Sequence, residues 1–322
     1  MKKSVRLLAL LATLLPAANA IAAEAYPARP VRMISPAGAG GVTDILGRVI
    51  AQKLGESLGQ QVIVDNRPGA SGIVGSQIVA KATPDGYTLL MVFPSHTVNQ
   101  SLYRDVPYDT AKAFAPITIV SQVAPVLIVN AQSPARSMQD LIKLAKAKPG
   151  ALNHGSVGAG SMGSLAAELL GSLAQIKFTQ VAYKGSPQAL TALISSELDF
   201  YLIGSVGTAA AQVKAGRVRA LGVGSKERVP AMPEVPPIAE TVPGYEARGW
   251  NGILAPAGTP KPIIDRLHRE LVAIVRSADF GQILTREGAT PIGNTPAEFD
   301  KVIRADIAKW AKIIKESSIK AE

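Results

Sequence analysis

Three loops rich in small residues follow strand patterns and precede helix patterns, at residues 36–44, 156–161 and 183–186. At such a junction, unpaired backbone N–H groups and the positive end of the helix dipole point at one spot, so an anion binds there without a formal cation. The alternative is that the loops are tight turns that bind nothing. We predict anion-binding positions in these loops at Ala37, Gly38, Gly40, Gly41, Thr43, Ser156, Gly158, Gly160, Ser161, Tyr183, Lys184 and Gly185.

The second loop also fits a dinucleotide-binding pattern, with glycines at Gly158, Gly160 and Gly163. That pattern requires an acidic residue about 20 positions further on to bind a ribose. The next strand ends instead in Ala182-Tyr183-Lys184. No nucleotide and no other cofactor are therefore predicted.

The same loop comes close to the serine-hydrolase elbow, with Ala159 in place of the first glycine and Ser161 as the nucleophile. A base would have to come from His96, His154 or His268, and none has the chain order and loop position that this fold requires. We predict no catalytic residue. A secreted hydrolase using Ser161 stays open as the alternative.

Two polar residues near the expected cleft have two interpretations each. His96 follows the strand predicted over residues 88–93, where it either lines the cleft or is an ordinary loop histidine. Asp44 either favours the dipole of the first helix or contacts the ligand, for example through an ammonium group or a bridging water. The histidines are far apart and no paired acidic loop accompanies them, so no metal site is predicted.

From residue 31 onward, short β-branched runs alternate with helix patterns, which is typical of βαβ units and a largely parallel sheet. The order of the runs predicts two lobes joined by two crossings, each lobe a doubly wound sheet flanked by helices, and hence a clamshell. We place the first lobe at residues 26–122 plus 251–322 and the second at 123–250, after a leader at 1–25.

Local patterns also mark individual helices. The helix expected over residues 43–58 carries an apolar stripe at Leu46, Ile50, Leu54 and Leu58. Helix-start patterns occur at Ser137-x-x-Asp140 and Thr295-x-x-Glu298. Two late helices are predicted, one after Thr259-Pro260 and one after Thr295-Pro296.

Composition narrows the function classes. The 322 residues include no cysteine, which excludes disulfides, thiolate nucleophiles and cysteine-ligated metals.

Residues 1–25 resemble a secretory signal, with a basic start, an apolar stretch and small residues at the end, so export to the periplasm is expected. The formal net charge is +10, but the basic residues are scattered and aromatics are few, so nucleic-acid binding is not expected. The uncharged stretch at 113–135 is interrupted by Pro116 and Pro125, and the mature protein should be soluble.

Six short motifs then occur in a characteristic order. They are Tyr26-Pro27-x-Arg29-Pro30, Gly40-Gly41-x-Thr43-Asp44, Asp65-Asn66-Arg67-Pro68-Gly69-Ala70, Pro84-Asp85-Gly86-Tyr87-Thr88-Leu89-Leu90, Tyr183-Lys184-Gly185 and Ala255-Pro256-Ala257-Gly258-Thr259-Pro260. Over residues 26–315 the chain resembles the Bug-type solute receptors of tripartite tricarboxylate transporters.

This resemblance implies a monomeric, two-lobed periplasmic binding protein of type II, a Venus flytrap, that closes on a small organic acid anion. It implies delivery of that acid to membrane permease subunits, although a receptor that feeds a sensor is not separable from sequence. By the same resemblance, the loops at 37–44 and 156–161 hold the carboxylates, often through waters in the first. Ala70, Ser71 and Ser95 are implied to face the cleft.

Departures from the family pattern bear on the ligand. Ala37 and Ala39 stand where the family usually has Phe and Pro, and Ser164 stands where it usually has His. Tyr201-Leu202-Ile203 replaces a common Met-Phe-Asp. We therefore expect a larger, less polar pocket and a bulkier or more apolar acid than a citrate-like one, such as an aromatic acid or a medium-length dicarboxylate.

Overall fold

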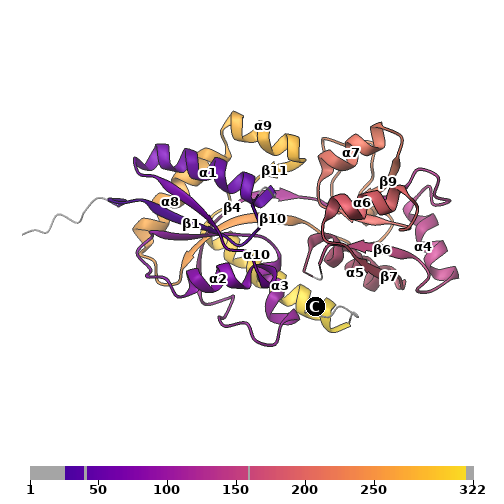
Figure 1. The fold of residues 1–322 in the computed structure, drawn as a ribbon, viewed down its shortest axis with the longest axis horizontal. Helices are drawn as coiled ribbons and strands as arrows, with labels where there is room; N and C mark the ends of the chain where they lie inside the picture. Colours follow the sequence, from indigo (N-terminus) through magenta and orange to yellow (C-terminus); the bar gives the residue numbers. More distant parts are fainter. Residues whose placement is uncertain (1–25, 40–41, 159, 317–322) are drawn as a thin grey trace, which may run out of the picture.

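The computed structural model describes residues 26–39, 42–158 and 160–316, which form two α/β lobes side by side (Figure 1). The leader expected at 1–25 lies outside the described residues. Within them, no helix combines the length and apolar character needed to cross a bilayer.

The larger lobe is built on a six-stranded sheet of order β11-β4-β10-β3-β1-β2. Strand β1 pairs in parallel with β2 and β3, whereas β10 runs antiparallel to β3 and β4, and β11 antiparallel to β4. The strands are β1 (Val31–Ser35), β2 (Val62–Asn66), β3 (Thr88–Val92), β4 (Phe114–Val123), β10 (Gly249–Pro256) and β11 (Ala289–Pro291).

Helices cover both faces of this sheet. On one face, α1 (Val42–Leu58), α8 (Lys261–Val275) and α9 (Ala278–Glu287) share a core with alternate strand residues such as Met33. On the other, α2 (Ile73–Ala80) and α10 (Pro296–Glu316) pack with Ile34, while α3 (Ser95–Leu102) lies beside α10 (Figure 1). The stripe predicted for the first helix is confirmed, because all four of its leucine and isoleucine side chains are buried.

The smaller lobe has a three-stranded sheet, β8-β5-β9, and a parallel pair, β6-β7, linked by a bridge between His154 and Phe200. Strand β5 is antiparallel to both neighbours. The elements are β5 (Val126–Asn130), α4 (Met138–Ala147), β6 (Asn153–Ser156), α5 (Met162–Ala174), β7 (Thr179–Ala182), α6 (Ser186–Ile194), β8 (Tyr201–Ile203), α7 (Val206–Lys214) and β9 (Val218–Val223).

Three sequence expectations need correction. The sheets are mixed rather than largely parallel, because β5 and β10 enter each lobe from the other one and run against the βα units there. A third late helix, α9, lies between the two that were predicted, and it ends at Gly288 in a left-handed conformation. The segment that was expected to be a loop around His96 is the start of α3.

The chain passes between the sheets at residues 124–125 and again just before β10. Gly224 lies between the two crossings, donating its N–H to Pro125 O (2.8 Å) and accepting at its carbonyl from Ala247 N–H (2.9 Å). A Cβ on Gly224 would lie 2.5 Å from Ala247 O, so only glycine allows this approach. The far end of α10 adds a third contact, since Trp310 and Ile313 are buried in the core of the smaller lobe.

Candidate functional site

A cavity of about 480 Å³ lies between the lobes. Its wall takes residues from strand ends and helix starts of both lobes: Thr43, Leu46, Ser71, Phe93, Pro94, Ser95, Val123, Val157, Gly158, Gly160, Ser161, Met162, Ser186, Gly204, Ser205, Gly249, Trp250, Asn251 and Ala289. None of these is a lysine, arginine, histidine or carboxylate. Among the described residues, the polar part of the wall therefore consists of hydroxyls, one amide and backbone groups.

On the larger lobe, Ser71 reaches the wall from an unusual backbone turn. Residues 69–72 all have positive φ, and Ala70 and Ser71 at φ 44° and 52° are not glycine. Such a turn persists only when its surroundings hold it. Here Ser95 Oγ and Asn99 Nδ2 both donate to Ser71 O (2.8 and 3.1 Å), and the hydroxyl groups of Ser71 and Tyr103 lie 2.8 Å apart. Ser71 and Ser95 line the cavity, whereas Ala70 does not.

Thr43 and Asn251 form a second polar group on this side. Thr43 Oγ1 donates to Asn251 Oδ1 (3.1 Å), and Asn251 Nδ2 donates to Ser121 Oγ (3.3 Å). Asn251 lies on β10, and it was not among the site residues predicted from the sequence.

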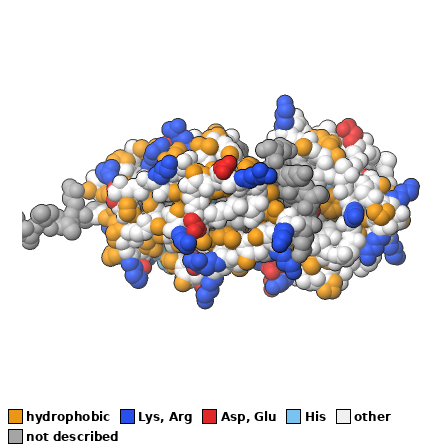
Figure 2. Space-filling model, turned by 90° about the horizontal axis from the view of Figure 1, so that it is seen from below, with side chains coloured by type: hydrophobic (Ala, Val, Ile, Leu, Met, Phe, Trp, Pro, Cys, Tyr) orange, Lys and Arg blue, Asp and Glu red, His pale blue; other side chains and the backbone are white. Residues whose placement is uncertain are grey.

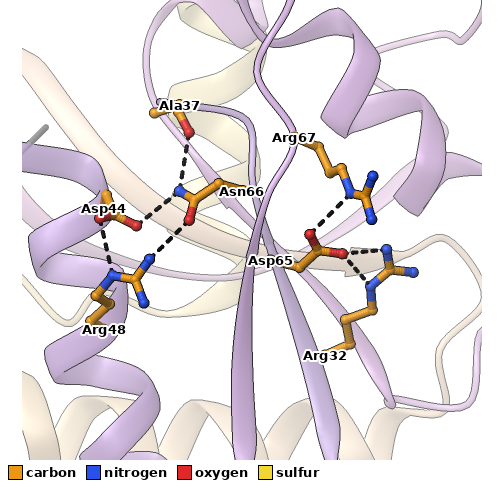
Figure 3. A network of polar contacts seen from close by, with 7 residues as sticks. All are labelled: Arg32, Ala37, Asp44, Arg48, Asp65, Asn66 and Arg67. Carbon is orange, nitrogen blue, oxygen red and sulfur yellow. Dashed lines mark hydrogen bonds and ion pairs between the residues drawn. The ribbon is translucent and has the colours of Figure 1, made fainter. Parts of the chain in front are cut away.

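The first loop contributes less to the wall than expected. Ala37 and Gly38 do not line the cavity, and Gly40 and Gly41 lie outside the described residues. Asp44 is only 3% exposed and is not on the wall either. Its carboxylate accepts from Arg48 Nε (3.0 Å) and Asn66 Nδ2 (2.8 Å), so of its two expected roles the structure supports the structural one (Figure 3).

On the smaller lobe, the loop after β6 is held by its own hydroxyls. Ser161 caps α5 by accepting from Ser164 N–H (3.3 Å), and Ser164 Oγ lies 2.7 Å from Ser156 Oγ. Ser156 Oγ also accepts from Gly158 N–H (3.3 Å). Gly158, Gly160 and Ser161 line the cavity, and Ser156 is buried behind them.

Tyr183, Lys184 and Gly185 are not brought to the cavity. Tyr183 borders a separate surface hollow, and Lys184 is exposed. Ser186, the next residue along, does line the cavity, as do Gly204 and Ser205 at the start of α7. The last two lie at a further strand-to-helix junction of the kind used to find the others, which the sequence analysis did not single out.

His96 does not line the cleft. It is 3% exposed and packs against Tyr108 and Phe114, with Nδ1 3.4 Å from Ser76 Oγ. Burial lowers the pKa of His96 to about 3. The cleft-lining interpretation was wrong because α3 begins at Ser95 and turns the next side chain into the sheet.

Ser161 has no hydrolase geometry. Its Oγ donates to Ser164 Oγ (2.9 Å), and the structure gives it no hydrogen bond to a histidine. His154 is completely buried among aromatic rings, and His268 Nε2 lies 3.0 Å from Asn294 O. Within the described residues, no group of three or more His, Asp or Glu side chains could hold a metal ion.

The apolar part of the wall includes Trp250, which sequence reasoning also missed. Its Nε1–H donates to Asp306 Oδ2 (2.8 Å), and its ring packs edge-on against Phe299. Burial raises the pKa of Asp306. Trp250 borders the cavity beside Phe93 and Met162, and its indole is held on two sides.

Besides the crossings and the end of α10, the two lobes approach each other at two places beside the cavity. Gly160 lies against Ser95 and Leu102 of the larger lobe. Gly288, after α9, approaches α7 so closely that a Cβ there would lie 2.3 Å from Val206 Cβ. Lys and Arg side chains are scattered over the face in Figure 2 rather than gathered in a stripe.

Comparison with known proteins identifies the family. The profile of the family described as tripartite tricarboxylate transporter family receptor matches residues 46–319. Protein BugT of Bordetella pertussis is 34% identical over 303 residues, covering 93% of each chain.

Among solved structures, R. palustris Rpa4515 with adipate has a TM-score of 0.79 at 35% identity, and the match covers 90% of this chain and 97% of that one. The periplasmic binding protein BugD has a TM-score of 0.77 at 30% identity, covering 92% and 100%. These similarities confirm the two-lobed binding-protein fold, and the chain belongs to the Bug-type receptors of the tripartite tricarboxylate transporter family.

Proposed function

We propose that this protein is a periplasmic receptor that captures a small organic acid anion between its lobes and delivers it to the permease of a tripartite transporter. The observation that carries the proposal is the interlobe cavity, whose polar wall consists of neutral donors and whose remainder is apolar. The leader at residues 1–25 supports export, and family membership supports delivery to a permease.

Neutral donors suffice to hold a carboxylate. Thr43, Ser161 and Ser205 stand at the starts of α1, α5 and α7, where helix N–H groups and dipoles favour an anion. Charge-assisted hydrogen bonds contribute about 1.5–3 kcal/mol each, so a few of them supply the ~8 kcal/mol of micromolar affinity. The proposed ligand-binding residues are Thr43, Ser71, Ser95, Gly158, Gly160, Ser161, Ser186, Ser205 and Asn251.

The apolar wall supports an acid with an apolar body. Trp250, Phe93 and Met162 offer no partner to the hydroxyl and additional carboxylate of a citrate-like acid, whose burial there would be costly. The structural neighbour Rpa4515 is described with adipate, a six-carbon dicarboxylate. We propose a medium-length dicarboxylate or an aromatic acid.

Binding follows from a shift in population between open and closed forms. An open cleft meets the ligand, the larger lobe takes a carboxylate, and the smaller lobe adds its contacts only on closure. Retention of the ligand depends on the closed form, and no covalent step is involved.

Isothermal titration calorimetry with adipate, phthalate, benzoate and citrate tests the ligand class. We expect heat and thermal stabilisation with adipate or an aromatic acid, and weaker binding of citrate. Tight binding of citrate with no heat from the other three acids would overturn the ligand class. Failure of all four acids to bind would overturn the proposal that the protein is an organic acid receptor.

Two further measurements test the hydrolase alternative and the delivery of the acid to a permease. Ser161→Ala should keep part of the ligand-induced stabilisation, whereas loss of a measurable turnover in this variant would favour the hydrolase. Uptake of the bound acid into proteoliposomes containing a tripartite permease should require the receptor. Uptake that is equal without the receptor would contradict delivery.

A further inference from the structure

We propose that Asn66, which does not touch the cavity, is the positioning residue that fixes Ala37 and Asp44, the two ends of the loop that leads to Thr43 on the cavity wall. The inference rests on the proposed function. Asn66 is the last residue of β2 and is paired in register with Ser35, the last residue of β1, so it stands level with the point where the loop begins.

Every polar atom of the Asn66 side chain is engaged (Figure 3). Its Nδ2 donates both to Ala37 O (3.1 Å) and to Asp44 Oδ1 (2.8 Å), and its Oδ1 accepts from Arg48 Nη2 (3.0 Å). Arg48 Nε closes the ring by donating to Asp44 Oδ2 (3.0 Å). Turning the amide over would set its oxygen against two acceptors, so a single orientation is possible.

These contacts join the two ends of the loop. Ala37 is at its start, and Asp44 is in the first turn of α1, next to Thr43 on the cavity wall. Asparagine is suited to this position because its neutral amide donates twice and accepts at one oxygen. Aspartate has the same shape but cannot donate when ionised, and it would place a second carboxylate against Asp44.

The preceding residue provides a matched control. Asp65 points to the other side of the strand, where it accepts from Arg32 Nε (2.9 Å) and pairs with Arg67 Nε (3.0 Å) (Figure 3). None of these contacts reaches residues 37–44. Asp65→Asn therefore removes an ionic contact of the same strand end without touching the loop.

The first experiment compares Asn66→Asp with Asp65→Asn in the full chain. Titration with adipate should give a Kd about tenfold weaker for Asn66→Asp and within about twofold of wild type for Asp65→Asn. Without any ligand, amide hydrogen exchange at Gly38, Ala39 and Thr43 should become faster in Asn66→Asp alone. Unchanged exchange in Asn66→Asp would overturn the proposal even if no acid binds, which keeps its failure distinct from failure of the proposed function.

A swapped pair separates positioning from general stability. In Asp44→Asn combined with Asn66→Asp, the new amide can donate to the new carboxylate and Arg48 keeps an anionic partner, so the midpoint of thermal unfolding should recover. Ala37 O still lacks its donor, so loop exchange should stay fast and adipate affinity low. Full recovery of both in the swapped pair would show that the Ala37 contact does not matter and would overturn the proposal.

Discussion

The loops that the two lobes present to the cavity are held in opposite ways. In the larger lobe, Ala37 and Asp44 at the two ends of the first loop are held by Asn66 and Arg48, through charged and amide groups from another strand and from the following helix. In the smaller lobe, Ser156, Gly158 and Ser161 are held by neutral hydroxyls within the loop and the first turn of α5. The first arrangement depends on correct pairing of β1 with β2, whereas the second depends on hydrogen bonds between residues close in the sequence.

This difference predicts which substitutions should disturb each loop. Substitutions remote in sequence should disturb the loop of the larger lobe, while the loop of the smaller lobe should respond to changes in its own few residues. Both loops can meet one ligand only when the lobes close, so the contacts between the lobes form a third, separable contribution.

The largest expected effect is a loss of folding stability at acid pH, to which one buried histidine in each lobe contributes. Burial lowers the pKa of both His96 and His154 to about 3, against 6.5 when unfolded. The unfolded chain binds more protons between these values, so stability is full above pH ~6.5 and is lost as the pH falls toward 3. The loss is about 1.4 kcal/mol per pH unit for each histidine, or roughly 5 kcal/mol for both by pH 4.5.

Urea unfolding at several pH values measures this slope. His154→Phe, which fits an aromatic surrounding, should remove about half of the slope, with the other half left to His96 in the larger lobe. Burial raises the pKa of Glu168 and Asp306, so their contributions to the pH slope of stability have the opposite sign. These contributions are the same in wild type and in His154→Phe. An identical slope in His154→Phe would show that His154 is not held neutral.

Glycine-to-alanine substitutions in the two helices that follow the loops should have opposite signs. A Cβ at Gly163 in α5 would lie 2.3 Å from Leu202 O, so Gly163→Ala should destabilise by about 3 kcal/mol, the upper end for overpacking. A Cβ at Gly47 in α1 meets nothing within 4 Å, so Gly47→Ala should stabilise by about 0.5–1 kcal/mol. Chemical denaturation measures both, and equal signs would contradict the packing described here.

The contact between the lobes can be tested at a pair of equivalent helix ends, with the smallest expected effect. Gly288 and Gly216 have nearly the same left-handed φ, 68° and 67°, but only Gly288 faces the other lobe. Both alanine variants should lose about 1 kcal/mol of stability from the backbone conformation. Only Gly288→Ala should also weaken adipate binding, by about tenfold, because it opposes closure. Equal adipate affinities in the two variants would show that the contact at Gly288 does not contribute to ligand binding.

Local features of the fold were predictable because their causes lie within a few residues. The Ser137 and Thr295 helix starts form as their patterns indicate, with Asp140 N–H donating to Ser137 Oγ (3.2 Å) and Thr295 N–H to Glu298 Oε2 (2.8 Å). Ser71 and Ser95, implied by the family resemblance, do line the cavity. Trp250 and Asn251 were missed because nothing near them in the sequence indicates that β10 runs past the cleft.

By itself, the sequence determined the α/β class, the stripe of α1, the caps and the small-residue turns, since helix period, capping and glycine geometry are local properties. Only the tertiary structure decided which turns converge. It left Tyr183, Lys184 and Gly185 outside the cavity, buried His96, and bound Asp44 to Asn66. Strand order and the face on which each helix packs bring distant segments together, and contacts between residues far apart in the chain determine both.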